Sequence, residues 1–441
     1  MRVFCAGLGR FAAVVLVPAA PAPCAQAYGP AAEATGQGAP PVGTPSTPAI
    51  PDELAAAAAR AVSGNPAMRA ARLANRAAAL DVRSARWLRA PSVSVNAFGF
   101  EGGTAVVRGD NLTANLVVDQ PIWQGGRITG AIERARAAER QSEALTDETG
   151  QDVALRVSDL YYELVRATRR IRALDRGLGE HTALIGSIER RVLQDVSPRV
   201  DLELARSRVD QLRDQQTNAQ AQGAAALEQL RVLLDDPQYG PAAAPGYDPA
   251  VHHPSDVGAL DAATRCSPTR RRLQADALVA RADARLARAQ LLPRLSAQFS
   301  SNEVTGERVG VAFSAATNGG LAQLDAERSA QLRREAAEVR IGAADIDIRS
   351  ALAGDFAENR AARDRVASSR AAATSARAVT DSYQRQFVVG RRSWLDVLNA
   401  ALEVAQAEVA AGDAEVAAMA SAARIELRTC RWQPQPPVSR P

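Results

Sequence analysis

The sequence contains no lysine and few residues of the types that build catalytic or metal sites. All 53 basic residues are arginine, and 441 residues include 3 histidines and 4 cysteines. The net charge of +4 is small and scattered, which argues against a nucleic-acid partner. We find no metal-ligand spacing, nucleophile elbow, phosphate loop or paired-carboxylate pocket. The sequence therefore predicts neither an enzyme nor a bound cofactor.

Long hydrophobic runs are also missing, and no stretch after residue 27 could cross a bilayer as a helix. Residues 1–27 combine two arginines, a short apolar core and the small-residue pattern Ala25-Gln26-Ala27, which is typical of a secretory signal peptide. A membrane anchor is the alternative, but the apolar run is far below the ~20 residues of a spanning helix. A lipid-modified Cys24 is a weaker alternative. The sequence predicts an exported protein.

Removal of such a signal leaves two cysteines, Cys266 and Cys430. They are too few for a disulfide framework, but one bridge is possible in an oxidising compartment. Both are expected near the middle of long helical arms, so we predict that they are bonded. Two free thiols are the alternative, and Cα atoms more than ~7 Å apart would exclude the bond.

An internal repeat organises the mature chain. Matching features recur about 200 residues apart. The distance in sequence between the two copies is eight residues shorter at the Gly-Gly pair than at the proline that precedes it. A longer loop at residues 101–111 in the first copy explains that drop. The pairs are Asn65-Pro66 with Ser267-Pro268, Pro91 with Pro293, Gly125-Gly126 with Gly319-Gly320, and Asp201 with Asp396.

Between each of these prolines and the next Gly-Gly the sequence alternates between apolar and polar residues. This predicts β-hairpins at residues 92–120 and 294–316, with strands of roughly nine residues, which is the length of a tilted strand that crosses a bilayer. Ordinary soluble hairpins are the alternative. Four strands cannot close a barrel, and an open edge in lipid leaves backbone groups unpaired. Three copies would supply twelve strands, enough to enclose a lumen.

A coiled-coil pattern follows each hairpin. Apolar residues recur in steps of four and three from Val153 to Val192, and again after Pro198. The outgoing arm, residues 127–193, would be roughly 100 Å long at 1.5 Å per residue. His181 occupies a seam position, where we expect a buried or tunnel-side polar residue rather than a ligand.

The remaining segments carry little pattern. Residues 235–258 are rich in proline and glycine and are expected to form an insert near the middle of the arms. His252 and His253 fall here and are interpreted as solvated loop residues. The tail after residue 428, including Trp432, is expected to add no further structure.

These features predict a mainly helical α+β chain in which a strand–strand–long helical hairpin unit occurs twice. The predicted parts are a signal peptide at 1–27, a Pro/Ala-rich linker at 28–50, a first repeat at 51–234 with its turn near 194–199, an equatorial insert at 235–258, a second repeat at 259–428 with its turn near 388–392, and a tail at 429–441. Trp87 and Trp123 fall where strand meets helix, which favours an interfacial aromatic belt, although two core tryptophans fit equally well.

The order of these elements, with the motifs QPIWQGGR and VGRRSWLDVLNA, resembles the TolC family of outer-membrane channel proteins over residues 50–428. The resemblance implies a homotrimer in the outer membrane. Its twelve-stranded β-barrel would sit in outer-membrane lipid and continue into a periplasmic α-helical coiled-coil barrel. The partners implied are a periplasmic adaptor and an inner-membrane transporter.

The segments RSWLDVLNA and SPRVDLELARSR are most similar to family members that serve type I secretion. That similarity implies an ABC-type transporter and a large secreted protein, such as a toxin or adhesin, as cargo. Efflux of drugs or other small molecules is the alternative within the family. A periplasmic coiled-coil adaptor is a remote alternative from another class.

The family pattern also implies an entrance gate at the ends of the hairpins. Arg392 and Asp201 match a family pair that holds neighbouring coils shut, and Asp396 matches an acidic ring that would favour cations. Two positions depart from the pattern: Phe387 replaces a tyrosine and lacks its hydroxyl, and Asn399 replaces a second acidic residue.

The same turns are the implied docking points for the adaptor. The Val-Gly pair of the family is kept at Val389-Gly390 and is followed by Arg391. In the first copy the equivalent segment contains Asp195 and Val196, which departs from the Val-Gly pattern.

Overall fold

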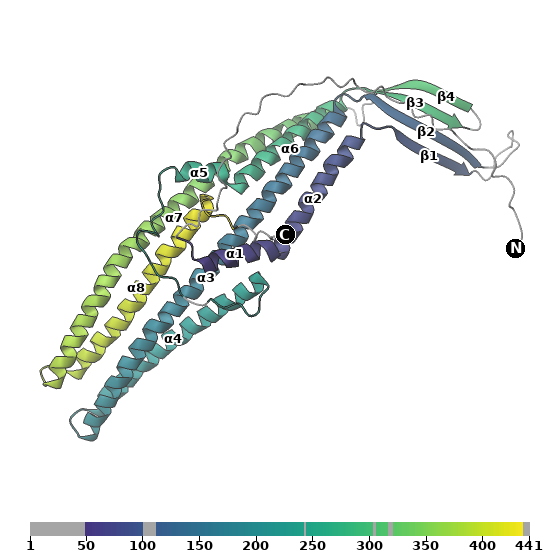
Figure 1. Ribbon diagram of the computed structural model, residues 1–441. Helices are drawn as coiled ribbons and strands as arrows, with labels where there is room; N and C mark the ends of the chain where they lie inside the picture. The colour runs from purple at the N-terminus through teal and green to yellow at the C-terminus, as the bar shows by residue number, and fades with distance from the viewer. Residues whose placement is uncertain (1–48, 100–111, 242–243, 303–305, 316–320, 435–441) are drawn as a thin grey trace, which may run out of the picture. The chain divides into compact units, whose positions relative to one another are not determined.

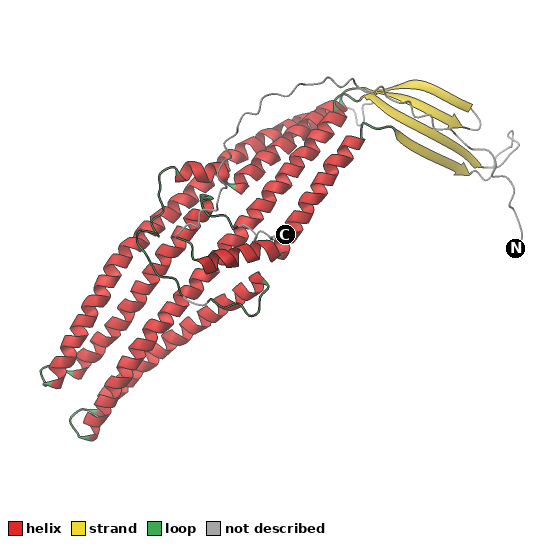
Figure 2. Cartoon of the chain, in the orientation of Figure 1, coloured by secondary structure: helices red, strands yellow, loops and turns green. Residues whose placement is uncertain are grey.

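The computed structural model describes residues 49–99, 112–241, 244–302, 306–315 and 321–434, all within one compact unit of the chain (Figure 1). In this described part the chain forms eight helices and four strands (Figure 2). The prediction of a mainly helical α+β chain is confirmed. The expected signal peptide, nearly all of the linker and the longer loop at 101–111 lie outside the described residues.

The two halves of the chain have the same order of elements. Each half contains a helix of 67 residues followed by a helix about half as long, 36 residues in α4 and 35 in α8. The first half comprises α1 (Asp52–Gly64), α2 (Pro66–Trp87), β1 (Ser92–Gly99), β2 (Leu112–Trp123), α3 (Arg127–Leu193) and α4 (Arg199–Leu234). The second comprises α5 (Ala259–Cys266), α6 (Pro268–Gln290), β3 (Arg294–Asn302), β4 (Gly306–Ser314), α7 (Ala322–Val388) and α8 (Trp394–Arg428).

The repeated pairs with proline are helix starts. The Asn65 side chain accepts a hydrogen bond from the Ala67 amide at 2.8 Å, and Ser267 Oγ accepts one from the Arg270 amide at 3.3 Å. A capping side chain satisfies an amide that has no partner inside the helix, and proline at the first helical position needs none. Both halves therefore use the same device to start the helix that leads into the sheet.

The four strands form one antiparallel sheet in the order β1-β2-β3-β4. The strand β2 runs three residues beyond the predicted end of its hairpin, through Pro121 to Trp123, where the pairing with β3 is irregular. Proline lacks the amide hydrogen that a ladder needs, so an irregularity at this point is expected. The strands β1 and β4 each pair on one side in the described sheet.

The strand register separates an apolar face from a polar face. One row across all four strands consists of Val93, Val118, Phe299 and Val309, and the row nearest the helices contains Trp123, Leu295 and Phe313. The opposite face carries hydroxyl and amide side chains at Ser92, Ser94, Asn96, Asn115, Ser296, Gln298 and Ser300. Successive side chains of a strand point to opposite faces, so the alternation in the sequence produces this division directly.

The long helix α3 packs against a different set of helices in each of its two halves. It contacts α2 and α6 after the sheet, and α4 and α8 further along, while α6 and α8 in turn contact α7 (Figure 1). The helices that follow and precede the strands therefore lie in the row α2-α3-α6-α7. This is the same order as the strands that they join. The helices α2 and α7 are the outer members of that row.

The predicted seam of α3 is its buried face. Val153, Val157, Leu174, His181 and Ile188 are all buried, as the steps of four and three require. Small residues bring the neighbouring helices close. A Cβ atom added at Gly177 would lie 2.8 Å from the Cβ of Ala405 in α8, and one at Gly223 would lie 3.0 Å from the Cβ of Ala167.

The Gly-Gly-Arg segment after β2 joins the sheet to the helices. Gly125 and Gly126 both have positive φ, and a Cβ atom at Gly125 would lie 2.7 Å from that of Leu292. Arg127 then donates hydrogen bonds to the carbonyls of Ala289 and Leu292, at 3.1 and 3.2 Å. Arg127 thus gives the carbonyls at and just beyond the end of α6 a side-chain partner, and glycine is needed at 125 because a side chain would collide there.

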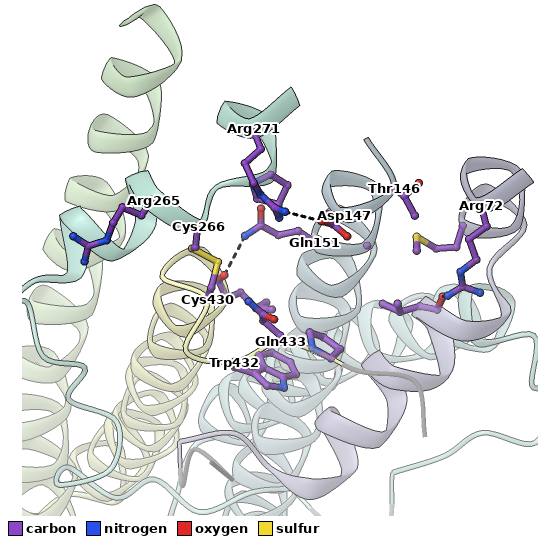
Figure 3. A pocket seen from close by; sticks show the side chains of 16 residues that line it. Arg72, Thr146, Asp147, Gln151, Arg265, Cys266, Arg271, Cys430, Trp432 and Gln433 are labelled. Carbon is purple, nitrogen blue, oxygen red and sulfur yellow. Dashed lines mark hydrogen bonds and ion pairs between the residues drawn. A yellow bond between two sulfur atoms is a disulfide. The ribbon is translucent and has the colours of Figure 1, made fainter. Parts of the chain in front are cut away.

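Cys266 and Cys430 form a disulfide with their Cα atoms 6.3 Å apart, which is the pairing expected from the sequence. Cys266 is the last residue of α5. The bridge lies in the wall of a cavity of about 690 Å³, beside Trp432 (Figure 3). Trp432 belongs to the main core cluster, so the expectation that nothing after residue 428 adds structure is wrong. Burial of the large indole stabilises the folded chain by more than the ordering of the short loop costs in conformational entropy.

The insert after α4 packs more closely on the helices than expected. His252 is 5% exposed and stacks on Tyr247, with ring centroids 5.5 Å apart. The side-chain amide of Asn359 in α7 donates to the His252 carbonyl at 3.5 Å. The interpretation of both histidines as solvated is therefore wrong for His252, while His253 is exposed. His252 is buried because it stacks on Tyr247, a contact that the composition of the insert does not predict.

Candidate functional site at the two hairpin tips

The two turns between the long helices have the same backbone geometry. We call residues 194–198 tip 1 and residues 389–393 tip 2. Asp195 and Gly390 adopt left-handed conformations, with φ of 54° and 70°, and each amide bonds to the carbonyl three residues earlier. The structure thus makes Asp195 and Gly390 equivalent, as the repeat predicts. Glycine adopts this conformation freely, whereas another residue costs roughly 1–2 kcal/mol.

A buried tryptophan joins the two hairpins next to their tips. Trp394, the first residue of α8, packs with Ile188, Ala205 and Leu398. Its Nε1 donates a hydrogen bond to Asp201 Oδ2 at 2.7 Å. Hydrogen bonds to a charged acceptor are roughly twice as strong as neutral ones. The Asp201 carboxylate is therefore held within one chain, at the start of α4.

Phe387 makes a second contact between the hairpins. The Arg191 guanidinium lies over its ring, 5.0 Å from the centroid. A cation over an aromatic face is attracted by about 0.5–1 kcal/mol at an exposed site. Phe387, which lacks the hydroxyl of the family tyrosine, thus links α3 to α7 through its ring instead.

The predicted pair of Arg392 and Asp201 is not formed within one chain. Arg392 instead bonds to Asp396 at 3.5 Å, four residues along, and lies 4.4 Å from the ring centroid of Tyr383. Asp201 faces the other hairpin, where the indole of Trp394 is the nearer donor. The Arg392 charge also offsets that of Asp396, while Asn399 is exposed and uncharged. A pair of Arg392 with Asp201 of another copy remains a proposal.

Both tips expose apolar side chains. Val196 is exposed in tip 1 and Val389 in tip 2, and beside the tips Leu193, Val200 and Val388 are exposed as well. Asp195 and Arg391 are exposed beside them. Isolated exposed apolar residues are common, but two such groups at equivalent turns indicate surfaces that a partner could cover.

Above the tips, two glutamates of α8 link the hairpins along their length. Each lies between an arginine of α3 and an arginine of α7, and the paired positions are seven residues apart on all three helices. Glu408 pairs with Arg176 at 2.7 Å and with Arg377, while Glu415 pairs with Arg370 at 2.5 Å and with Arg169. Arg170 adds a two-pronged pair with Asp413, both contacts at 2.8 Å. Single exposed pairs contribute little, but this network fixes how α8 lies against both neighbours.

His181 is buried in the seam of α3. Its exposed fraction is 0%, and its Nδ1 lies 2.8 Å from the Gly177 carbonyl, so that nitrogen donates. Burial lowers the pKa of the imidazole below its ordinary value, and Arg208 adds to the effect, while the hydrogen bond to Gly177 opposes it. Protonation of His181 therefore requires a charge in an apolar seam.

The stability of the chain should fall on mild acidification. Because the pKa of His181 is lower when folded, the unfolded chain binds more protons below about pH 6.5, and the free energy of unfolding decreases there. His252 acts in the same direction, since burial also lowers its pKa. We expect His181→Gln to reduce the loss in melting temperature between about pH 7.5 and pH 5.5. The exposed His253→Gln is the control, and an equal reduction in that variant would contradict the assignment.

Sequence reasoning missed Trp394, Arg191 and the glutamates of α8. The available signal for Trp394 was a large aromatic residue at the start of a predicted helix, directly beside the matched gate residues. Nothing in the sequence pairs that indole with Asp201, 193 residues away.

The described residues contain no cluster of histidine, cysteine, aspartate or glutamate that could hold a metal ion. None of the helices in that part of the chain is both long and apolar enough to cross a membrane.

The first half of the chain matches a known protein family. Residues 57–235, which span most of α1 and all of α2, β1, β2, α3 and α4, match the family described as outer membrane efflux protein. A search of curated proteins found no match.

Solved structures match over most of the chain. The outer-membrane channel OprN is 20% identical, with a TM-score of 0.78 over 88% of this chain and 92% of that one. VceC of Vibrio cholerae is 15% identical, with a TM-score of 0.75 over 86% and 96%. MtrE of Neisseria gonorrhoeae, in its open state, is 16% identical, with a TM-score of 0.73 over 87% and 90%. The chain thus has the fold of these outer-membrane channels, and its residues 57–235 match the outer membrane efflux protein family.

Proposed function

We propose that three copies of this chain form an export channel that crosses the outer membrane and extends into the periplasm. The observation that carries the proposal is that the sheet and the row of helices end in matching open edges. Strand β1 follows α2 at one edge, and β4 precedes α7 at the other. In lipid an open strand edge leaves backbone groups unpaired, so closure by further copies is required.

The outer helices carry apolar stripes suited to such closure. Leu73, Leu80 and Trp87 are exposed at intervals of seven residues along α2. Leu332, Val339 and Ile346 are exposed at the same interval along α7. Seven residues are close to two helical turns, so each set lies along one side of its helix. We infer that α2 of one copy packs on α7 of the next, in a head-to-tail ring.

The sheet has the two faces that such a ring requires. With the apolar rows toward lipid, Trp123 lies at the end nearest the helices, where aromatic residues favour the membrane interface. The polar rows then line the lumen. Three copies supply twelve strands, which is wide enough for an aqueous channel. Trp87 continues the α2 stripe. Its side chain would therefore contact the neighbouring copy, which is an alternative to the predicted place in the aromatic belt at the membrane interface.

Charge placed in the helical stripe tests the assembly. We expect Leu80→Glu to abolish the trimer, because an unpaired carboxylate would be buried between copies. Ala74→Glu is the matched control, since it adds the same charge at an exposed position of α2 away from the stripe. Heat-dependent migration of outer-membrane fractions on gels measures the outcome. A trimeric Leu80→Glu protein, or monomers in both variants, would contradict this interface.

The tips are the proposed docking points for a periplasmic adaptor, which connects the channel to an inner-membrane transporter. Val389, Gly390 and Arg391 at tip 2, and Asp195 and Val196 at tip 1, are exposed and lie at equivalent turns. We assign both turns to docking, although Asp195 gives tip 1 a negative charge that tip 2 lacks.

Two classes of cargo fit this channel. Type I secretion of a large protein, with an ABC-type transporter, is supported by the segments around Asp201 and Asp396. Efflux of small molecules is supported by the description of the matched family. Deletion of the gene distinguishes them: loss of one secreted protein supports the first, and increased sensitivity to several toxic compounds without such a loss supports the second.

A further inference from the structure

We propose that Asp119 sets the ionic selectivity of the barrel lumen. Its negative charge opposes the positive charges of two arginines that lie at other heights along the lumen. The inference rests on the proposed function, because it requires that the polar face of the sheet lines a channel. It concerns the barrel and does not depend on the gate at the tips.

Three charged side chains of the described strands lie on the polar face: Asp119, Arg294 and Arg308. The register places them at different heights. Arg294 is nearest the helices, Asp119 lies opposite Gln298 four residues further along β3, and Arg308 lies opposite Ser300 one row beyond that. At about 3.3 Å per residue, Asp119 is roughly 13 Å above Arg294 and Arg308 is roughly 7 Å higher again.

The Asp119 carboxylate is held by neutral partners. Its Oδ2 accepts hydrogen bonds from Ser296 Oγ at 2.8 Å and from Gln298 Nε2 at 2.9 Å. No ion pair to Asp119, Arg294 or Arg308 is found among the described residues. Asp119 and Arg308 are two strands and one row apart, about 12 Å, which exceeds the Debye length of about 8 Å at physiological ionic strength. The charges therefore act on the lumen separately and do not cancel locally.

In a trimer these positions form a ring of three carboxylates between two rings of three guanidinium groups. Rings of fixed charge lining a pore determine which sign of ion passes more readily. The described lumen face carries two positive charges and one negative charge per chain. Among these described charges, Asp119 alone favours the passage of cations. Its removal should leave a lumen that favours anions.

Reversal potentials of the purified trimer in a planar bilayer, across a KCl gradient, test the assignment. We expect Asp119→Asn to shift the potential toward anion selectivity and Arg308→Gln to shift it toward cations. Glu307→Gln is the matched control, because Glu307 lies on the apolar face of the same sheet. An unchanged potential in Asp119→Asn, or an equal shift in Glu307→Gln, would overturn the inference. A parent protein that forms no conducting pores would instead contradict the proposed function itself.

Chemical restoration of the charge guards against a folding defect. In Asp119→Cys the added thiol is the target, because Cys266 and Cys430 are bonded to each other and Cys5 and Cys24 lie in the predicted signal peptide. Iodoacetate adds a carboxylate as the thiolate displaces iodide, whereas iodoacetamide adds a neutral amide of similar size. We expect iodoacetate to return the parent's potential and iodoacetamide to leave the anion-favouring value. Equal potentials after both treatments would show that charge at this position does not matter.

Discussion

Replacement of Trp394 by phenylalanine is expected to raise the single-channel conductance of the proposed trimer. Phenylalanine keeps most of the packing with Ile188 and Leu398 but cannot donate to the Asp201 carboxylate. A hydrogen bond to a charged group contributes about 1.5 kcal/mol or more. Its loss would shift the balance between joined and separated hairpins by about tenfold in each chain. Conductance in planar bilayers measures the change.

A double-mutant cycle identifies the true partner of Asp201. If the indole holds the carboxylate, Trp394→Phe and Asp201→Ala should each raise conductance, and the double variant should be well short of additive. Arg392→Ala combined with Asp201→Ala tests the alternative pair between copies in the same way. Strong coupling to Arg392 with none to Trp394 would show that the contact within one chain does not control the entrance.

Replacement of Gly177 by valine is expected to destabilise the protein strongly. The new Cβ would lie 2.8 Å from the Cβ of Ala405, a contact that neither helix backbone can avoid without moving. Overpacking of this kind costs typically about 1–3 kcal/mol, and here it also pushes α8 away from α3. We expect a lower melting temperature and, because the hairpins separate, a weaker constraint at the tips.

Gly179→Val is the matched control on the same helix. Nothing lies within 4 Å of a Cβ atom at Gly179. Removal of glycine from a helix interior is neutral or favourable by a few tenths of a kcal/mol, so the melting temperature should stay the same or rise. Similar losses in both variants would mean that helix propensity, rather than the close approach to Ala405, decides the result.

Several parts of the fold could be predicted because they depend on local patterns. The seam of α3 follows from the spacing of apolar residues, and the starts of α2 and α6 follow from Asn65 and Ser267. The position of β2 was predicted less well, since the strand continues through Pro121 where propensity argues for an end. His252 was misjudged because its burial depends on stacking with Tyr247 in an insert that has no regular pattern.

The sequence by itself determined the repeat, the length of the helices and the two-sided character of the strands. Each of these is a periodic property of one segment, and periodicity is written in consecutive residues. Only the tertiary structure decided that Asp201 meets Trp394 rather than Arg392, and that Glu408 and Glu415 bridge α3 and α7. These contacts depend on the register between hairpins nearly 200 residues apart, which close packing at positions such as Gly177 fixes and no local pattern specifies.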